Sequence, residues 1–261
     1  MVWVAGHFGE WVQGCLGENV ALVTLACPTR GVEASWQEAH HLVLDDRAGL
    51  VGPERAGAFL AALGLSERGL VRIAPDLPAG VGAGMSTAAL VAVARAAGAA
   101  EDRIAMACLA VEGAVDPVML PVPDAILWAP REAVTLARMS PPPRADILGG
   151  LWGPPMPTDP RDTAFPEVHD LVAAWAAGPD LPQAARLASL SAARTTALRG
   201  PEGDPTADLV GRLGALGWAR AHTGSARALI FPPGAIPANG ETVLREAGYD
   251  HVFRFRTGCR P

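Results

Sequence analysis

Apolar and polar positions along the chain alternate in two ways, one typical of half-buried strands and the other of amphipathic helices. Short β-prone runs fill most of the first half, whereas helical spacing covers 167–216 and gives way to strands near the end. This order of elements predicts an α+β protein with two lobes. The predicted strands span 2–5, 19–27, 32–36, 41–44, 70–74, 125–129, 134–137, 218–222, 227–231 and 251–255, and the predicted helices span 53–63, 87–97, 101–111, 167–177, 181–198, 206–216 and 240–247.

The clearest break in this pattern is a proline-rich stretch with paired glycines at 140–166. Such a composition indicates a linker or a long functional loop, because proline cannot donate a backbone hydrogen bond to a strand ladder or a helix. We therefore divide the chain into a first lobe at 1–140, a linker or lid at 141–166 and a second lobe at 167–261.

Composition narrows the class of protein. Half of the residues are apolar, 18% are charged and the net charge is −6, which favours a large folded core and argues against nucleic-acid binding. No apolar run is long enough to cross a membrane and 1–20 lacks the basic segment of a signal peptide, so we expect a cytoplasmic protein with no membrane partner. A homodimer is compatible with this composition. The scattered cysteines predict reduced, structural thiols at Cys15, Cys27, Cys108 and Cys259.

A glycine-rich loop at 78–84 is the first candidate for chemistry. Gly80, Gly82 and Gly84 let the backbone turn tightly and approach a ligand closely. Ser86 then opens a run with helical spacing, so unpaired backbone N–H groups face the loop. This arrangement binds anions, above all phosphate. The chain contains no lysine, which excludes the lysine-bearing phosphate loop of many nucleotide-binding proteins.

Two other interpretations of this loop stay open. It can be an ordinary glycine-rich turn with Ser86 as the N-cap of the following helix. It can also belong to an NAD(P)-dependent oxidoreductase, but the dinucleotide fingerprint needs Gly or Ala at a sixth position where this chain has Met85 or Thr87.

The pattern Pro78-x-x-x-Gly82-x-Gly84-x-Ser86-x-Ala88 resembles the second motif of the GHMP kinases, a superfamily that includes galactokinase, homoserine kinase and mevalonate kinase. The resemblance implies that the loop wraps the phosphates of ATP and that Ser86 contacts Mg²⁺ or phosphate. The family usually carries two adjacent serines here, and the first of them is Met85 in this chain. The implied phosphate-binding residues are Pro78, Gly80, Gly82, Ala83, Gly84, Met85, Ser86 and Thr87.

Two further segments resemble the other motifs of this superfamily. Near the N-terminus, Gly9-Glu10-Trp11-Val12-Gln13-Gly14 is similar to the first motif in the form found in the L-threonine kinases, which implies that Glu10 and Gln13 bind the acceptor. Between two predicted strands, 221–226 is similar to the third motif, although Thr-Gly-Ser is also common in hairpin turns. The substrate-binding residues implied there are His222, Thr223, Gly224 and Ser225.

Two carboxylates, Glu112 and Asp116, follow the predicted helix 101–111. Their spacing places them on one face if the helical turn persists. The resemblance implies that Glu112 holds Mg²⁺ together with Ser86 and that Asp116 is the base for the attacking hydroxyl. The threonine kinases carry a Glu-Pro-Thr-Asp-like sequence here, and this chain differs from it in register. Glu112 can also be a solvated carboxylate at a helix end.

The resemblance implies an ATP- and Mg²⁺-dependent kinase that converts L-threonine, a hydroxy amino acid, to O-phospho-L-threonine for the aminopropanol arm of cobalamin. It also implies the two-lobed GHMP fold, with an N-terminal lobe like domain 2 of ribosomal protein S5 and a ferredoxin-like C-terminal lobe. The alternatives are a homoserine kinase or another metabolite kinase of this superfamily, and a catalytically impaired nucleotide-binding paralogue. Catalytic roles are assigned on this basis to Asp116, Ser86 and Glu112.

Overall fold

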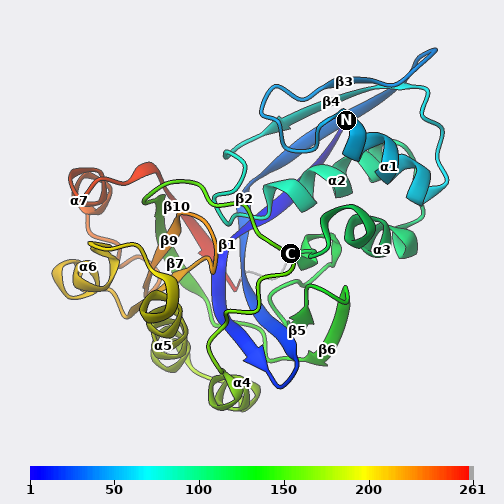
Figure 1. Ribbon diagram of the computed structural model, residues 1–261. Coiled ribbons are helices and arrows are strands. Elements are labelled where there is room, and N and C mark those ends of the chain that lie inside the picture. Colours follow the sequence, from blue (N-terminus) through cyan, green and yellow to red (C-terminus); the bar gives the residue numbers. More distant parts are fainter. Residues whose placement is uncertain (259–261) are drawn as a thin grey trace.

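A ten-stranded sheet runs through both halves of the molecule and forms its frame (Figure 1). The structure is a computed structural model and describes residues 1–258, so Cys259 lies outside the described residues. The strands are β1 (Val2–Leu16), β2 (Asn19–Glu38), β3 (Val43–Asp45), β4 (Gly69–Pro75), β5 (Ile126–Ala129), β6 (Val134–Arg138), β7 (Ala145–Leu151), β8 (Gly217–Arg220), β9 (Ala226–Phe231) and β10 (Asp250–Thr257). The helices are α1 (Pro53–Leu63), α2 (Met85–Ala96), α3 (Glu101–Glu112), a short 3₁₀ turn at Pro117–Met119, α4 (His169–Ala176), α5 (Leu181–Arg199), α6 (Thr206–Leu213) and α7 (Gly240–Glu246).

A long antiparallel hairpin, β1 with β2, occupies the middle of the sheet. The sequence predicted short strands at 2–5, 19–27 and 32–36, and this was wrong, because β2 continues through Pro28. The pairing partner shifts from Gly31 to Cys27 between Ala5 and Gly6, so 28–30 lie in a bulge where a proline needs no partner. Further register shifts interrupt β1 between His7 and Val12. Bulges re-aim side chains, and here they lie within the segment that resembles the first kinase motif.

Helices α1, α2 and α3 cover one part of the sheet, and α2 packs directly against β1 and β2 (Figure 1). Almost every side chain of α2 from Met85 to Ala94 is buried, because its alanines let the helix approach the sheet closely. This burial fixes the position of the N-terminus of α2, which carries the glycine-rich loop. The predicted helix 53–63 was correct, and its N-terminal proline and following left-handed Gly64 are the usual start and stop signals.

The C-terminal part follows the order β7, α4, α5, α6, β8, β9, α7, β10, with strands arranged β10-β7-β9-β8. With α4 and α6 taken as additional helices, the remaining elements are β7, α5, β8, β9, α7 and β10. This is the ferredoxin-like βαββαβ arrangement that the resemblance implied. Strand β8 pairs with β1 through Arg220 and Glu10, so the two halves share one continuous sheet.

The prediction that all of 141–166 is a linker or lid was wrong, because β7 lies within it as a fully buried inner strand. Strand β7 contains Gly149 and Gly150, which weaken its strand pattern. Both glycines are required by packing: a Cβ on Gly149 would stand 2.6 Å from the Phe8 ring, and one on Gly150 would stand 3.0 Å from Tyr249. Within 141–166, the stretches 141–144 and 152–166 have no regular secondary structure.

Within the described residues, every helix is too short or too polar to cross a bilayer. The cysteines among them, Cys15, Cys27 and Cys108, are free thiols, as predicted.

Candidate active site

The glycine-rich loop leads directly into the N-terminus of α2. Gly80, Gly82 and Gly84 all have left-handed backbone angles, with φ values of 72°, 76° and 66°. The N-cap of α2 is Gly84, and no side chain caps the helix, so the interpretation of Ser86 as the N-cap was wrong. The first backbone N–H groups of α2 are therefore free to bind an anion in front of the loop.

Segments from both ends of the chain hold this loop in place. The backbone N–H of His7 donates to the Ala83 carbonyl (3.1 Å), and the N–H of Ala226 donates to the Val81 carbonyl (2.8 Å). A Cβ on Gly82 would stand 2.1 Å from the Cβ of Ala221, so the close approach of the chain requires glycine there. The fold thus brings together the three segments that resemble kinase motifs.

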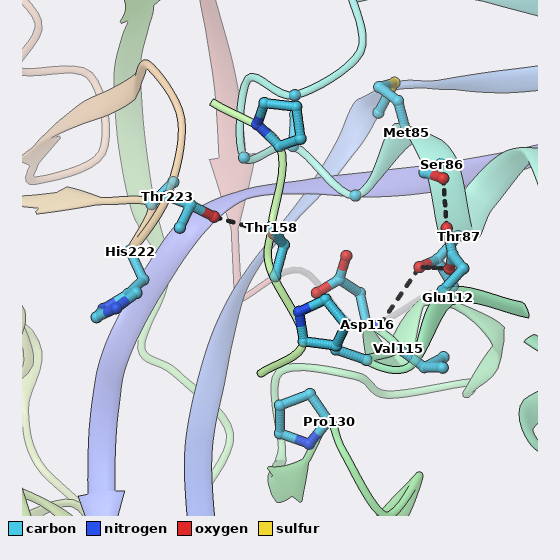
Figure 2. A pocket seen from close by; sticks show the side chains of 18 of the residues that line it. Met85, Ser86, Thr87, Glu112, Val115, Asp116, Pro130, Thr158, His222 and Thr223 are labelled. Carbon is cyan, nitrogen blue, oxygen red and sulfur yellow. Dashed lines mark hydrogen bonds between the residues drawn. The ribbon is translucent and has the colours of Figure 1, made fainter. Parts of the chain in front are cut away.

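Two hydroxyls at the start of α2 bind one buried carboxylate at the end of α3. Thr87 Oγ1 donates to Glu112 Oε2 (2.7 Å), and Ser86 Oγ donates to Glu112 Oε1 (Figure 2). The Nη1 atom of Arg55 lies 3.8 Å from Glu112 Oε1. Burial raises the pKa of Glu112 to about 7, although the two hydroxyls oppose this shift. Glu112 is therefore a buried carboxylate in a polar cluster, and its interpretation as a solvated helix-end group was wrong.

The bulged part of β1 brings His7 between two carboxylates. Its Nε2 lies 3.2 Å from Asp116 Oδ2, and its Nδ1 lies 3.3 Å from Glu10 Oε1. His7 and Glu10 are 4% and 5% exposed, whereas the Asp116 side chain is 30% exposed. Burial lowers the pKa of His7, but the charges of Asp116 and Glu10 outweigh it and raise the pKa to about 9. Sequence reasoning assigned no role to His7, because its contact with Asp116 depends on the bulged pairing of β1 and not on a local motif.

A cavity of about 580 Å³ connects these groups. In Figure 2, Ser86, Thr87 and Glu112 lie on one side, His222 and Thr223 lie on the other, and Asp116 lies between them. The predicted site residues that line this cavity are Glu10, Gln13, Pro78, Gly80, Gly82, Ala83, Gly84, Met85, Ser86, Thr87, Glu112, Asp116, His222 and Thr223.

Two predicted substrate-binding residues do not line this cavity. Ser225 is buried, with 2% of its surface exposed. Its backbone carbonyl accepts a hydrogen bond from the Trp152 N–H (2.8 Å). Gly224 packs against the Val81 backbone and lines a smaller cavity behind the loop. These placements correct the expectation that all four residues of 222–225 face one substrate.

The segment 152–166 forms one wall of the large cavity. The Met156 N–H donates to the Gly80 carbonyl (2.7 Å), and Thr158 Oγ1 lies 3.0 Å from Thr223 Oγ1. Further along, the Phe165 ring stacks on His222 with centroids 3.7 Å apart. This segment therefore touches both the glycine-rich loop and the 221–226 loop.

The residues that line the large cavity fit a nucleoside triphosphate with Mg²⁺. The left-handed glycines make a cradle that a Cβ would fill, and the first turn of α2 offers backbone N–H donors to phosphate oxygens. Hydroxyl and carboxylate oxygens, as in Ser86 and Glu112, are the ligands that Mg²⁺ prefers. The buried Glu112 carboxylate has Arg55, at 3.8 Å, as its cationic neighbour among the described residues.

No protein-family model matches this sequence, and a search of curated proteins found no match. Solved structures are similar over almost the whole chain. Mevalonate kinase from Methanococcus jannaschii shares 11% identity, with 98% of this chain and 96% of that chain covered, at a TM-score of 0.63. Phosphomevalonate kinase from Streptococcus pneumoniae shares 12% identity, with 98% and 100% covered, at a TM-score of 0.64. Homoserine kinase from Cytophaga hutchinsonii shares 13% identity, with 98% and 94% covered, at a TM-score of 0.60. These neighbours are kinases of the GHMP family, and this chain has the α+β fold of the GHMP kinases.

Proposed function

We propose that the protein is an ATP-dependent kinase that phosphorylates an alcohol group of a small molecule. One observation carries the proposal. Ser86 and Thr87 bind Glu112 directly beyond the glycine-rich loop, and Asp116 borders the same cavity. Phosphoryl transfer requires positioned phosphates, charge neutralisation and a group that accepts the proton of the attacking hydroxyl, and this cluster has a candidate for each task.

In the proposed reaction the glycine-rich loop and the N-terminus of α2 bind the phosphates of ATP. Ser86 and Glu112 would hold Mg²⁺, which neutralises phosphate charge when bound. The acceptor hydroxyl oxygen attacks the γ-phosphorus, and its proton passes to Asp116. The bond from the γ-phosphorus to the β–γ bridging oxygen breaks, and ADP leaves. His7, with its Nε2 3.2 Å from Asp116 Oδ2, orients that carboxylate for its role as base.

We propose L-threonine as the acceptor and O-phospho-L-threonine as the product, for the aminopropanol arm of cobalamin. The support is the sequence Gly9-Glu10-Trp11-Val12-Gln13-Gly14 together with the position of Glu10 and Gln13 in the lining of the cavity. Glu10 is a partner for the ammonium group of an amino acid. Homoserine is the second candidate, because one structural neighbour is a homoserine kinase.

The test is a screen for ADP release with L-threonine, L-serine, L-homoserine and 1-aminopropan-2-ol, each with and without Mg²⁺. We expect Mg²⁺-dependent turnover with L-threonine. Ser86→Ala and Glu112→Gln should each reduce turnover at least 100-fold, in the range for loss of a charge-stabilising group. The matched control is Glu101→Gln, at the exposed start of the same helix α3. ATP binding without turnover on any acceptor would instead identify a catalytically impaired paralogue.

A further inference from the structure

A second, smaller cavity of about 110 Å³ lies behind the 221–226 loop and is lined by three arginines. Arg220 and Arg227 come from β8 and β9 and are 5% and 1% exposed. Arg199 comes from the last turn of α5. His222 lines this cavity and the large one, so the arginine cavity adjoins the site described above.

The charges in this arginine cavity do not balance. Arg227 Nε pairs with Asp204 Oδ2 (2.7 Å), and Arg199 Nη1 pairs with Asp162 Oδ2 (2.5 Å). In contrast, no carboxylate oxygen of the described residues lies within 4.0 Å of a guanidinium nitrogen of Arg220. Three guanidinium groups therefore share two carboxylates.

The hydrogen bonds of Arg220 leave part of its donor fork free. Its Nε donates to the Ala221 carbonyl (3.0 Å), and its Nη1 donates to Thr196 Oγ1 (2.8 Å). These partners are neutral and do not compensate the charge. Burial and the neighbouring Arg227 lower the pKa of Arg220 to about 9, which still leaves it protonated at pH 7. A buried cation without a counter-ion is costly, and an anion in the cavity would remove that cost.

His222 adds a second group without a partner. It is 5% exposed, and neither ring nitrogen has a hydrogen-bond partner in the described part of the chain. Burial and the charge of Arg199 lower the pKa of His222 to about 3, so the ring is neutral and carries one N–H donor. The Phe165 ring, stacked at an interplanar angle of 7°, holds the His222 ring in its orientation.

We propose that the arginine cavity is an oxyanion site that binds the carboxylate or phosphate group of a small molecule through Arg220, with Arg199, Arg227 and His222 around it. A planar guanidinium fork matches both kinds of oxyanion. The volume of 110 Å³ is several times the ~30 Å³ that one water occupies in the liquid, so a single oxyanion fits. Two sources supply this chemistry. One is the anionic group of the phosphoryl acceptor, a choice that rests on the proposed function, and the other is free phosphate.

The first experiment measures binding of inorganic phosphate by titration calorimetry in the presence of saturating ADP and Mg²⁺. Arg220→Gln should weaken phosphate binding at least tenfold, whereas Arg212→Gln, an exposed arginine on α6, should leave it unchanged. The glycine-rich loop can also bind phosphate, so the difference between the variants is the result that counts. Equal affinity in wild type and Arg220→Gln would overturn the proposal. Arg220→Lys keeps the charge without the fork and should give an intermediate affinity, and thermal unfolding of each variant checks its fold.

The second experiment distinguishes the two sources by comparing L-threonine with 1-aminopropan-2-ol, which has the same hydroxyl and amine but no carboxylate. If the acceptor supplies the anion, Arg220→Gln raises the KM for L-threonine at least tenfold and leaves the KM for the amino alcohol unchanged. If free phosphate is the ligand, both KM values stay unchanged while phosphate affinity falls. If wild type phosphorylates neither compound, the proposed function fails, and the calorimetric comparison alone decides the oxyanion site.

Discussion

His7 Nε2 lies 3.2 Å from Asp116 Oδ2, so the most buried histidine of the cavity directly contacts the carboxylate that we propose as the base. The opposite nitrogen of the same ring faces Glu10 at 3.3 Å. Because the pKa of His7 is raised to about 9, the ring is an imidazolium at neutral pH and pairs with the Asp116 carboxylate, which fixes the position of that side chain. His7 is therefore a positioning residue for the proposed reaction.

The first prediction is that His7→Gln lowers kcat by about 10- to 100-fold, the range expected when a general base is mispositioned or loses its charge partner. His7 loses its own proton as the pH rises through about 9, so the wild-type rate should fall on the basic side of the pH–rate profile, and this fall should be absent in His7→Gln. A rate profile from pH 6 to 10, with the KM for ATP measured alongside, checks this. The control is His169→Gln, an exposed histidine on α4. An unchanged profile in His7→Gln would refute the role.

The second prediction concerns stability against pH. The folded protein keeps the His7 proton up to about pH 9, whereas an unfolded chain releases it near pH 6.5. The stabilising contribution is therefore complete below pH 6.5 and is lost as the pH rises through about 9. Urea unfolding at pH 6, 7.5 and 9 should show falling stability, with a flatter dependence in His7→Gln.

The sequence predicted the glycine-rich loop and the helix at 53–63, because these depend on local spacing and turn residues. The ferredoxin-like lobe was implied by the family resemblance and not by local spacing. It did not predict β7 or the role of His7. In β7, Gly149 and Gly150 are required because the Phe8 and Tyr249 side chains pack against them. Neither of these neighbours is close in sequence. His7 reaches Asp116 through a register shift in β1. Both features come from tertiary packing, which overrides local pattern.

The third prediction separates close packing from backbone strain at two left-handed glycines. Gly82 has a φ of 76°. In Gly82→Ala the new Cβ would lie 2.1 Å from the Ala221 Cβ and 2.5 Å from the Thr223 carbonyl oxygen. Gly98 has a φ of 79°, but a Cβ added there would have no neighbouring atom within 4 Å. Both should lose about 1 kcal/mol of stability from strain. Only Gly82→Ala should also raise the KM for ATP at least tenfold, measured by ADP release. Equal KM values for ATP would show that the loop tolerates displacement.

The fourth prediction tests the buried ion pair beside the arginine cavity. The side chains of Arg227 and Asp204 are 1% and 3% exposed, and the Arg227 charge contributes to a lowered pKa of Asp204 against the effect of burial. Asp204→Asn would leave Arg227 buried without its counter-ion, so we expect a loss of about 3–5 kcal/mol in the free energy of unfolding. Urea denaturation at pH 7 measures this. Asp170→Asn, which breaks the exposed pair with Arg194, is the control and should have a much smaller effect.

The last prediction concerns Met85, the position where the resembling kinases usually carry a serine. Its side chain is 3% exposed, and its Cε lies only 2.3 Å from where a Cβ on Gly6 would stand, so it fills space between α2 and β1. Met85→Ser should therefore open a cavity and lose about 2–5 kcal/mol of stability, as large-to-small core changes do. Because the side chain packs toward β1, the new hydroxyl should not lower the KM for ATP or the Mg²⁺ requirement. Thermal unfolding and ADP-release kinetics measure both effects, and Met106→Ser, exposed on α3, is the matched control. A Met85→Ser protein with wild-type stability and tighter Mg²⁺ dependence would instead mean that position 85 faces the metal.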